Sequence, residues 1–314
     1  MATPQHVLVL GGTGFVGRHL IARLAAAGHR VTVIARRRAN ARHLILLPTV
    51  QVVEGDPFDA ATLAERMRGA SAVVNLVGIL HESPREAFAD IHVEGTRKVV
   101  AACRSGSVAR LLHMSAINAA PDAPSRYLRS KGEAEKIVAD SGLAWTIFRP
   151  SVIFGREDSF LNRFASLLRS FPVIPLGAAG ARFAPIYVTD VVRCFGHALS
   201  DDTTIGQRYN LCGPDVYTLK ELFLHVGETI GRPRRIVALG PALASLQARV
   251  FEALPGKLLS RDNLASMQKD AVCGAPFPPV FGFAPTRLAT VAPTWLAPAA
   301  VKSRFDPLRA QGRR

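Results

Sequence analysis

The sequence has no long apolar run and no basic leader, and each absence excludes a class of protein. The longest apolar stretches are strand-sized, far short of the ~20 residues that a membrane-spanning helix needs. Residues 1–6 carry no basic segment typical of a signal peptide. We therefore expect a globular protein of the cytoplasm, either free or bound peripherally to the inner face of a membrane.

Cysteine is also scarce. The four cysteines, Cys103, Cys194, Cys212 and Cys273, are widely spaced, so none suggests a metal knuckle or a redox-active pair. No His, Cys, Asp or Glu spacing is typical of a metal site, and no Ser-His-Asp arrangement is visible. We expect four reduced, mostly buried thiols and no bound metal.

Acidic residues are outnumbered by basic ones, 24 against 39, which gives a formal net charge of +15. This balance favours an acidic partner such as a nucleotide phosphate, an anionic lipid or a nucleic acid, although a genome rich in G and C would produce the same excess of arginine. No aromatic-rich basic motif or other nucleic-acid-binding signature is present, so we expect no nucleic-acid partner. The oligomeric state cannot be inferred from these features.

Strand and helix patterns alternate in the first half of the chain. Strands are expected at residues 6–10, 31–34, 50–53, 72–77, 110–114 and 145–148, and helices at 18–27, 60–68, 91–104 and 125–139. Strands that alternate with helices of this length form a parallel sheet with helices on both faces. We predict an α/β protein with a doubly wound parallel Rossmann sheet over residues 1–155.

The alternation is lost in the second half, where proline and glycine are dense over residues 171–185. A strand is expected at 207–211, and helices at 218–230 and 241–254. The last of these is apolar on most faces. We predict a small α/β C-terminal substrate domain over 156–300 and a basic, flexible tail over 301–314.

The first strand leads directly into a glycine loop, Gly11-Gly12-Thr13-Gly14-Phe15-Val16-Gly17. Gly11 permits a tight turn, Gly14 lets the backbone approach a pyrophosphate, and Gly17 lets the following helix pack on the strand. The N-terminus of that helix offers N–H groups and a partial positive charge to phosphates. We therefore predict a dinucleotide-binding turn, with Thr13, Phe15 and Val16 as further contacts.

The end of the second predicted strand distinguishes the two nicotinamide cofactors. Enzymes that use NAD usually place an acidic residue there, for the ribose 2′-hydroxyl, whereas this chain has Arg36-Arg37-Arg38. A guanidinium can pair with a 2′-phosphate in a bidentate, charge-assisted way. We predict NADP(H) in preference to NAD(H), with Arg36 on the phosphate and Arg37 or Arg38 stacked on the adenine.

The ends of the third and fourth predicted strands carry further candidate cofactor contacts. Asp56 is placed to accept a hydrogen bond from the adenine amino group, and Asn75, Val77 and Gly78 are placed to line the ribose and pyrophosphate. These residues are also compatible with ordinary strand-to-loop punctuation.

Tyr127 and Lys131 share a helix face at a spacing of four. The ammonium is expected to lower the pKa of the tyrosine, which could then exchange a proton with a substrate hydroxyl or carbonyl. Lys131 could also bond the nicotinamide ribose. Ser115, at the end of the fifth predicted strand, is placed to bond the substrate oxygen.

Together these residues resemble the extended form of the short-chain dehydrogenase/reductase superfamily. The resemblance covers most of the chain, including the glycine loop, Val93-Glu94-Gly95-Thr96, Ser115, the Tyr127-x-x-x-Lys131 motif and residues 148–155, 186–191 and 209–214. In that superfamily the segment matching Arg149-Pro150-Ser151 closes over the nicotinamide. The resemblance therefore implies contacts from Pro150 and Val152.

A narrower likeness is carried by residues 113–116, 127–133 and 155–164. It is similar to an atypical group that includes the nucleotide-binding accessory subunit of respiratory complex I and bacterial relatives often labelled nucleoside-diphosphate-sugar epimerases. The accessory subunit holds NADPH and is generally regarded as structural. His92 stands where an asparagine is common in the superfamily, and we expect it to be a packed or hydrogen-bonded residue.

Three functions remain open. The first is an NADP-dependent oxidoreductase acting on a hydroxyl or carbonyl of an unknown small molecule through Ser115, Tyr127 and Lys131. The second is a non-catalytic NADPH-binding subunit or assembly factor of a respiratory or quinone-related assembly, at an anionic membrane surface. The third is a nucleotide-sugar epimerase or dehydratase, with Arg182 and Arg208 on a substrate phosphate. The short segment between Ser115 and Tyr127 disfavours the third.

Overall fold

The computed structural model describes residues 3–253 and 259–297. By their internal contacts, the residues divide into two compact units, and the chain passes between them several times. The first unit is Met1–Pro150, Val188–Leu211 and Ala275–Phe283, and the second is Ser151–Tyr187, Cys212–Gly274 and Ala284–Arg314. The predicted basic tail, 301–314, lies outside the described residues.

The first unit is built on a seven-stranded parallel sheet in the order β11-β6-β5-β4-β1-β2-β3. Its strands are β1 (His6–Leu10), β2 (Arg30–Ala35), β3 (Val50–Glu54), β4 (Ala72–Asn75), β5 (Arg110–Met114), β6 (Ala144–Pro150) and β11 (Gln207–Leu211). The central strands are mainly apolar because both faces are covered, as Val7 to Leu10 in β1 illustrate with no solvent exposure. This order confirms the predicted doubly wound sheet.

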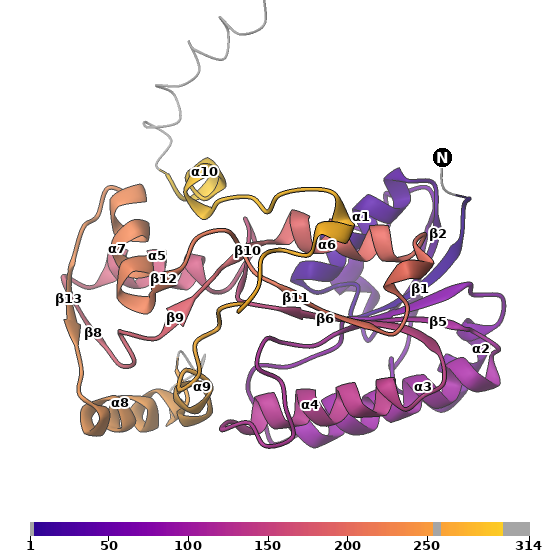
Figure 1. Cartoon of the computed structure of the whole chain (residues 1–314), viewed down its shortest axis with the longest axis horizontal. Coiled ribbons are helices and arrows are strands. Elements are labelled where there is room, and N and C mark those ends of the chain that lie inside the picture. The colour runs from indigo at the N-terminus through magenta and orange to yellow at the C-terminus, as the bar shows by residue number, and fades with distance from the viewer. Residues whose placement is uncertain (1–2, 254–258, 298–314) are drawn as a thin grey trace, which may run out of the picture. The chain divides into compact units, whose positions relative to one another are not determined.

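Helices cover both faces of this sheet (Figure 1). The first unit contains α1 (Phe15–Ala26), α2 (Ala60–Met67), α3 (Gly95–Ser105), α4 (Arg126–Ala139) and α6 (Val188–Ala198), the π-helical turn η2 (Ala89–Glu94), and the 3-10 turns η1 (Arg38–Ala41), η3 (Asp202–Thr204) and η4 (Pro279–Phe281). Helices α2, α3 and α4 pack side by side on one face, and α1 packs with α6 on the other. The strand order reverses between β1 and β4, and in doubly wound sheets ligands bind outside the carboxyl ends of the strands at such a reversal.

Three element boundaries differ from the sequence prediction for identifiable reasons. Helix α1 begins at Phe15 rather than residue 18, because the extended Gly14 already serves as its N-cap. Strand β6 continues to Pro150, where Leu211 of β11 pairs with it. The helix expected at 91–104 is divided into the π-helical turn η2 and the regular helix α3.

The second unit combines short strand pairs with helices around its own apolar core. Its elements are β7 (Ile153–Phe154), α5 (Leu161–Ser170), β8 (Val173–Leu176), β9 (Arg182–Phe183), β10 (Ile186–Tyr187), β12 (Tyr217–Thr218), α7 (Leu219–Thr229), β13 (Arg235–Ala238), α8 (Pro241–Ala253), α9 (Arg261–Ser266), α10 (Leu288–Val291) and α11 (Pro293–Leu296). Phe164 of α5 and Phe223 of α7 stack within that core with ring centroids 4.0 Å apart. No helix within the described ranges reaches the length and apolarity needed to cross a bilayer.

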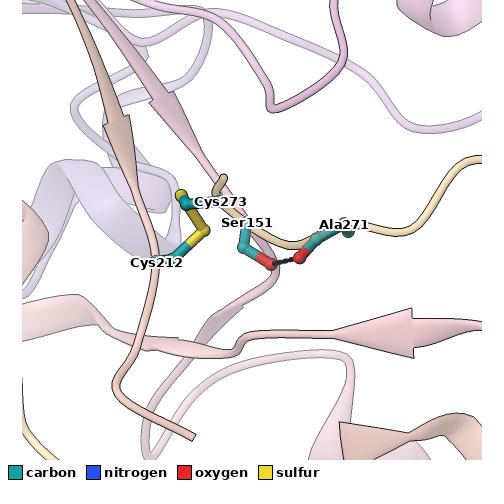
Figure 2. Close-up of a disulfide and its surroundings, with 4 residues drawn as sticks. All are labelled: Ser151, Cys212, Ala271 and Cys273. Carbon is teal, nitrogen blue, oxygen red and sulfur yellow. Dashed lines mark hydrogen bonds between the residues drawn. A yellow bond between two sulfur atoms is a disulfide. The ribbon is translucent and has the colours of Figure 1, made fainter. Parts of the chain in front are cut away.

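Cys212 and Cys273 form a disulfide in the second unit (Figure 2), so the expectation of four reduced thiols is wrong for this pair. They are 61 residues apart in sequence. They meet because the segment before Cys273 pairs with Phe183 through Ala271, while the residue after Cys212 bonds to Ala184. The spacing of the cysteines in the sequence does not predict this pairing, because it depends on contacts between distant segments. The other two cysteines are free and buried, as expected.

Candidate functional site

The glycine loop joins β1 to α1 at the strand-order reversal. Gly14 is an N-cap without a side chain, so the first-turn N–H groups of Phe15, Val16 and Gly17 receive no side-chain cap. The first turn also contains no acidic residue. An anion placed here would therefore meet donors and the positive end of the helix dipole with no competing carboxylate in that turn.

Two glycines of the loop are required by close contacts. A Cβ on Gly17 would lie 2.4 Å from the carbonyl oxygen of Gly11. Gly11 itself has φ +77°, and a Cβ there would lie 2.9 Å from the main-chain carbon of Leu76. The loop is thus pressed against the end of β4, and it leaves a backbone cradle of the kind that a pyrophosphate fills.

Arginines lie at the end of β2, as the sequence predicts. Arg36 pairs with Glu86, and both side chains retain solvent exposure, 70% and 29%. Arg37 is exposed too, and the backbone N–H of Arg38 donates to the Glu54 carboxylate at 3.1 Å. An exposed ion pair contributes little net free energy, so a 2′-phosphate could replace Glu86 as the partner of Arg36 at small cost.

The other predicted cofactor residues lie at the carboxyl ends of β3 and β4. The Asp56 side chain is exposed and accepts from the Phe58 N–H at 2.9 Å. Asn75 is buried, and its Oδ1 accepts from the Val77 N–H at 3.2 Å. This bond fixes the turn at Val77 and Gly78, next to the glycine loop. Both carboxyl ends therefore have ordinary local hydrogen-bonding roles, while the cofactor contacts assigned to them remain predictions.

Helix α4 brings Lys131 and Tyr127 against the end of β5. The Lys131 ammonium is buried and donates to the main-chain carbonyl of Met114 at 3.1 Å. Gly132 permits this approach, because a Cβ there would lie 2.4 Å from the main-chain carbon of Ala120. Tyr127 packs against a small buried cluster of Ala116, Ala123 and Leu128, which joins the loop after β5 to α4. Lys131 and Tyr127 therefore both lie beside the end of β5, while their roles in a site remain predictions.

Burial reverses one electrostatic expectation for this cluster. It raises the pKa of Tyr127 to about 12, whereas the four-residue spacing from Lys131 predicts a lowered pKa. Burial also lowers the pKa of Lys131 to about 8, partly offset by Glu135 one turn further along α4. The phenol is thus a neutral proton donor at physiological pH. The prediction that Lys131 favours a phenolate at Tyr127 is therefore wrong.

At the carboxyl end of β5, two buried polar groups have no hydrogen-bond partner among the described residues: His113 Nε2 on the strand and Ser115 Oγ directly after it. Ser115 is 4% exposed and His113 is 2% exposed. Asn75 donates to His113 Nδ1 at 3.4 Å, because its Oδ1 is occupied, so Nε2 carries the proton. An unpaired buried hydroxyl is costly to leave unmatched, and Ser115 is suited to bond a substrate oxygen.

His92 was not assigned a site role from sequence, yet it links the cofactor side of the cluster to α4. Its Nε2 accepts from the Ile79 N–H at 3.0 Å, so Nδ1 carries the proton and contacts Ser130 Oγ at 2.8 Å. Ser130 in turn donates to the Tyr127 carbonyl at 2.8 Å. The one sequence feature that could have pointed to this role is that His92 stands where an asparagine is common in the superfamily. The hydrogen-bonded role expected for His92 is what the structure contains.

Other predicted residues are engaged elsewhere. Arg149 is bonded to the buried Glu135 carboxylate, and Arg208 lies 3.5 Å from the same carboxylate. Arg182 pairs with Asp270 at 3.9 Å in the second unit. The arginines considered for a sugar-nucleotide phosphate therefore already have acidic partners.

Pro150 and Val152 fall in different units. Pro150 ends β6 and is buried, whereas Val152 is packed on the core of the second unit. Among residues 3–253 and 259–297, no group of three or more His, Cys, Asp or Glu side chains could hold a metal ion.

Comparisons with known proteins agree with this geometry. A family model described as NAD(P)H-binding matches residues 11–159. The fold and the cradle define an NAD(P)-binding protein of the Rossmann type. The chain belongs to the family of NAD(P)-binding proteins that includes the 40 kDa subunit of mitochondrial NADH-ubiquinone oxidoreductase.

Two relatives are subunits of this kind, and the assignment rests on the second, of which the chain covers more than two thirds. A mitochondrial NADH dehydrogenase [ubiquinone] 1 alpha subcomplex subunit 9 of Arabidopsis thaliana is 36% identical over 80% of this chain and 64% of its own length. The chain thus spans less than two thirds of that relative. The 40 kDa subunit of NADH-ubiquinone oxidoreductase of Neurospora crassa is 30% identical over 84% of this chain and 71% of its own length.

Enzymes are also among the similar proteins. A (4-alkanoyl-5-oxo-2,5-dihydrofuran-3-yl)methyl phosphate reductase of Streptomyces griseus is 32% identical over 74% of this chain and 77% of its own length. The solved dTDP-glucose 4,6-dehydratase of Streptomyces venezuelae, with NAD bound, matches 74% of this chain and 84% of its own, with a TM-score of 0.65 and 24% identity. The last likeness concerns the fold alone.

The buried histidines generate a prediction about acid stability. Burial, with the Lys131 charge, lowers the pKa of His92 to about 2 and that of His113 to about 3, from 6.5. Between pH 6.5 and about 3 these histidines are therefore protonated in the unfolded chain and neutral in the folded chain. As the pH is lowered through this range, the free energy of unfolding should decrease by up to ~1.4 kcal/mol per pH unit for each histidine.

Urea unfolding at a series of pH values measures this slope. His92→Gln and His113→Gln should each make it shallower, while the exposed His43→Gln is the matched control. A slope equal to wild type in both variants contradicts the assigned protonation.

Proposed function

We propose that the protein is an NADP(H)-dependent oxidoreductase acting on a hydroxyl or carbonyl substrate, with NAD(H) the poorer cofactor. The observation that carries this proposal is the buried, unpartnered Ser115 hydroxyl at the end of β5, next to the loop on which Tyr127 packs. The proton donor, the hydrogen-bond donor and the Lys131 ammonium are all attached to β5 or α4. Rigid elements of this kind hold reacting groups in fixed geometry.

The residues present fit an NADP(H) molecule. The backbone cradle between Gly11 and Gly17 suits the pyrophosphate, and Asp56, Asn75, Val77 and Gly78 would follow toward the adenine and the ribose. Arg36 and Arg37 supply exposed guanidinium groups where a 2′-phosphate would lie, and no acid follows β2 directly. This supports NADP(H), as a carboxylate there would repel the phosphate.

When bound, the nicotinamide supplies or accepts the hydride. Tyr127, neutral because of its raised pKa, donates its phenolic proton to the substrate oxygen during reduction. Ser115 donates a hydrogen bond to the same oxygen. The Lys131 ammonium stabilises the charge that develops on the phenolate, and its pKa near 8 allows it to stay protonated at neutral pH.

Cofactor choice is tested at Arg36. Arg36→Asp should weaken NADPH binding about 10- to 100-fold, because a charge-assisted bidentate pair is replaced by repulsion. NADH affinity should be nearly unchanged. Isothermal titration with each cofactor measures both, and Arg97→Asp, at another exposed arginine paired with a nearby glutamate, is the matched control. Equal losses for NADPH and NADH would mean that Arg36 does not read the 2′-phosphate.

Catalysis is tested at Tyr127. Tyr127→Phe removes only the hydroxyl, so it should reduce turnover ~10²- to 10⁴-fold while NADPH affinity stays close to that of wild type. NADPH oxidation over a panel of ketones and aldehydes gives the rate, and titration gives the affinity. A variant that keeps full activity on an identified substrate would falsify the acid role.

A second candidate function is an NADPH-binding partner of a membrane-associated respiratory assembly. It is supported by the names of the relatives and by the outer face of α8. On that helix Leu243, Leu246 and Val250 are 58%, 57% and 52% exposed, whereas Ala244 and Ala248 face the core. An apolar stripe of this kind, on a chain of net charge +15, suits an anionic membrane surface.

Co-sedimentation with vesicles of phosphatidylglycerol and phosphatidylcholine tests this face. The triple variant Leu243→Ser/Leu246→Ser/Val250→Ser should lower binding at least about tenfold, because three side chains lose apolar burial. Leu224→Ser, at an exposed leucine of α7, is the matched control. Wild-type protein that stays unbound at low salt contradicts the membrane role.

A further inference from the structure

The disulfide lies where the chain enters and leaves the second unit. Cys212 directly follows Leu211, the last residue of β11, and Ser151 directly follows Pro150, the last residue of β6. Leu211 and Pro150 are register partners in the sheet. Cys273 lies two residues before the chain returns to the first unit. Three of the passages between the units are thus close to one covalent bond.

The segment 271–273, here called the clasp, is also held by hydrogen bonds (Figure 2). The Ala271 carbonyl accepts from Ser151 Oγ at 2.6 Å and from the Ala184 N–H at 3.0 Å. The Ala271 N–H donates to the Arg182 carbonyl at 2.8 Å. The clasp therefore pairs beside the segment that runs through Ala184, and the Ser151 hydroxyl is bonded directly to it.

Cys212 approaches the same segment from another side. The next residue, Gly213, donates to the Ala184 carbonyl at 3.1 Å, and a Cβ there would lie 1.8 Å from the Pro185 carbonyl oxygen. Ala184 is thus hydrogen-bonded to the clasp on one side and to Gly213 on the other, and the disulfide links the clasp to Cys212 covalently. Cys273 is only half-buried, so a reductant has access to one end of the bond.

We propose that the Cys212–Cys273 disulfide is a redox-controlled lock on the Ser151 segment. While oxidised, it keeps the clasp bonded to Ser151, and so holds the chain between Pro150 and Val152 in place. The consequence for the cofactor rests on the proposed function, in which those two neighbours contact the nicotinamide. Reduction releases the clasp and weakens NADP(H) binding.

The reduction step takes a dithiol reductant. One of its thiolates attacks the accessible Cys273 sulfur, the Cys212–Cys273 bond breaks and a mixed disulfide forms. The second thiol of the reductant then attacks that mixed disulfide. In total, two electrons and two protons pass to Cys212 and Cys273, which become thiols, while the reductant becomes a disulfide.

The experiment uses the full chain in a Cys103→Ala/Cys194→Ala background, so that only the pair reacts. Oxidised and dithiothreitol-reduced samples are compared by thiol labelling, thermal unfolding, hydrogen exchange and NADPH titration. On reduction we expect two labelled thiols, a melting temperature lower by roughly 5–10 °C, and at least about tenfold faster exchange at residues 150–153. The NADPH Kd should rise about tenfold, which corresponds to ~1.4 kcal/mol, and reoxidation should restore it.

Two further variants separate the lock from a general loss of stability. Cys212→Ser/Cys273→Ser should have the melting temperature, hydrogen exchange and NADPH Kd of the reduced form, and adding reductant should change none of them. Ser151→Ala keeps the disulfide but loses the hydrogen bond to Ala271. It should raise the NADPH Kd of the oxidised protein, and reduction should then raise the Kd by a smaller factor than in wild type. Oxidised and reduced protein with equal exchange at residues 150–153 would overturn the proposal. A lower melting temperature with unchanged exchange and Kd would also overturn it, since the bond would then only add stability.

The outcomes distinguish this inference from the proposed function. Protein that binds NADPH in neither state, yet shows reversible redox-dependent exchange at residues 150–153, supports the lock and refutes the cofactor assignment. Protein that binds NADPH equally in both states supports the cofactor assignment and refutes the lock.

Discussion

The buried ammonium of Lys131 organises the candidate site. A charged group inside a protein is tolerated only where its surroundings satisfy it, and here the Met114 carbonyl accepts a hydrogen bond from the ammonium while Glu135 supplies an opposite charge. These partners require α4 to lie close on the end of β5. Gly132 makes that approach possible, and it also brings the end of α4 that carries Tyr127 toward Ser115, the residue directly after β5.

The same charge shapes the titration of its neighbours. It adds to the effect of burial on His92 and His113, so both histidines remain neutral. His92 can then use one ring nitrogen as an acceptor and the other as a donor, and it connects the turn after β4 to α4. The Lys131 ammonium is thus balanced by the Glu135 carboxylate, while His92, His113 and Tyr127 beside it stay neutral, an environment compatible with a neutral tyrosine acid.

The family includes both reductases and subunits of respiratory assemblies, and the structure suggests why one scaffold suits both. The cradle depends on glycine backbone and on a helix N-terminus, whereas proton transfer would depend on Ser115 and Tyr127. These two sets of groups lie on different elements. Cofactor binding can therefore persist whether or not chemistry does, and the choice between the two roles depends on a few side chains and on exposed surface such as the outer face of α8.

What the sequence determined by itself is local. The glycine loop, the arginines after β2 and the four-residue spacing of Tyr127 and Lys131 are read from short windows, because turn chemistry and helical periodicity act over a few residues. The resemblance of the chain to the extended reductases rests on the same motifs. The tertiary structure alone decided the pairing of Cys212 with Cys273, the raised pKa of Tyr127 and the two hydrogen bonds of His92. Each of these depends on burial or on contacts between residues far apart in sequence, which no local pattern encodes.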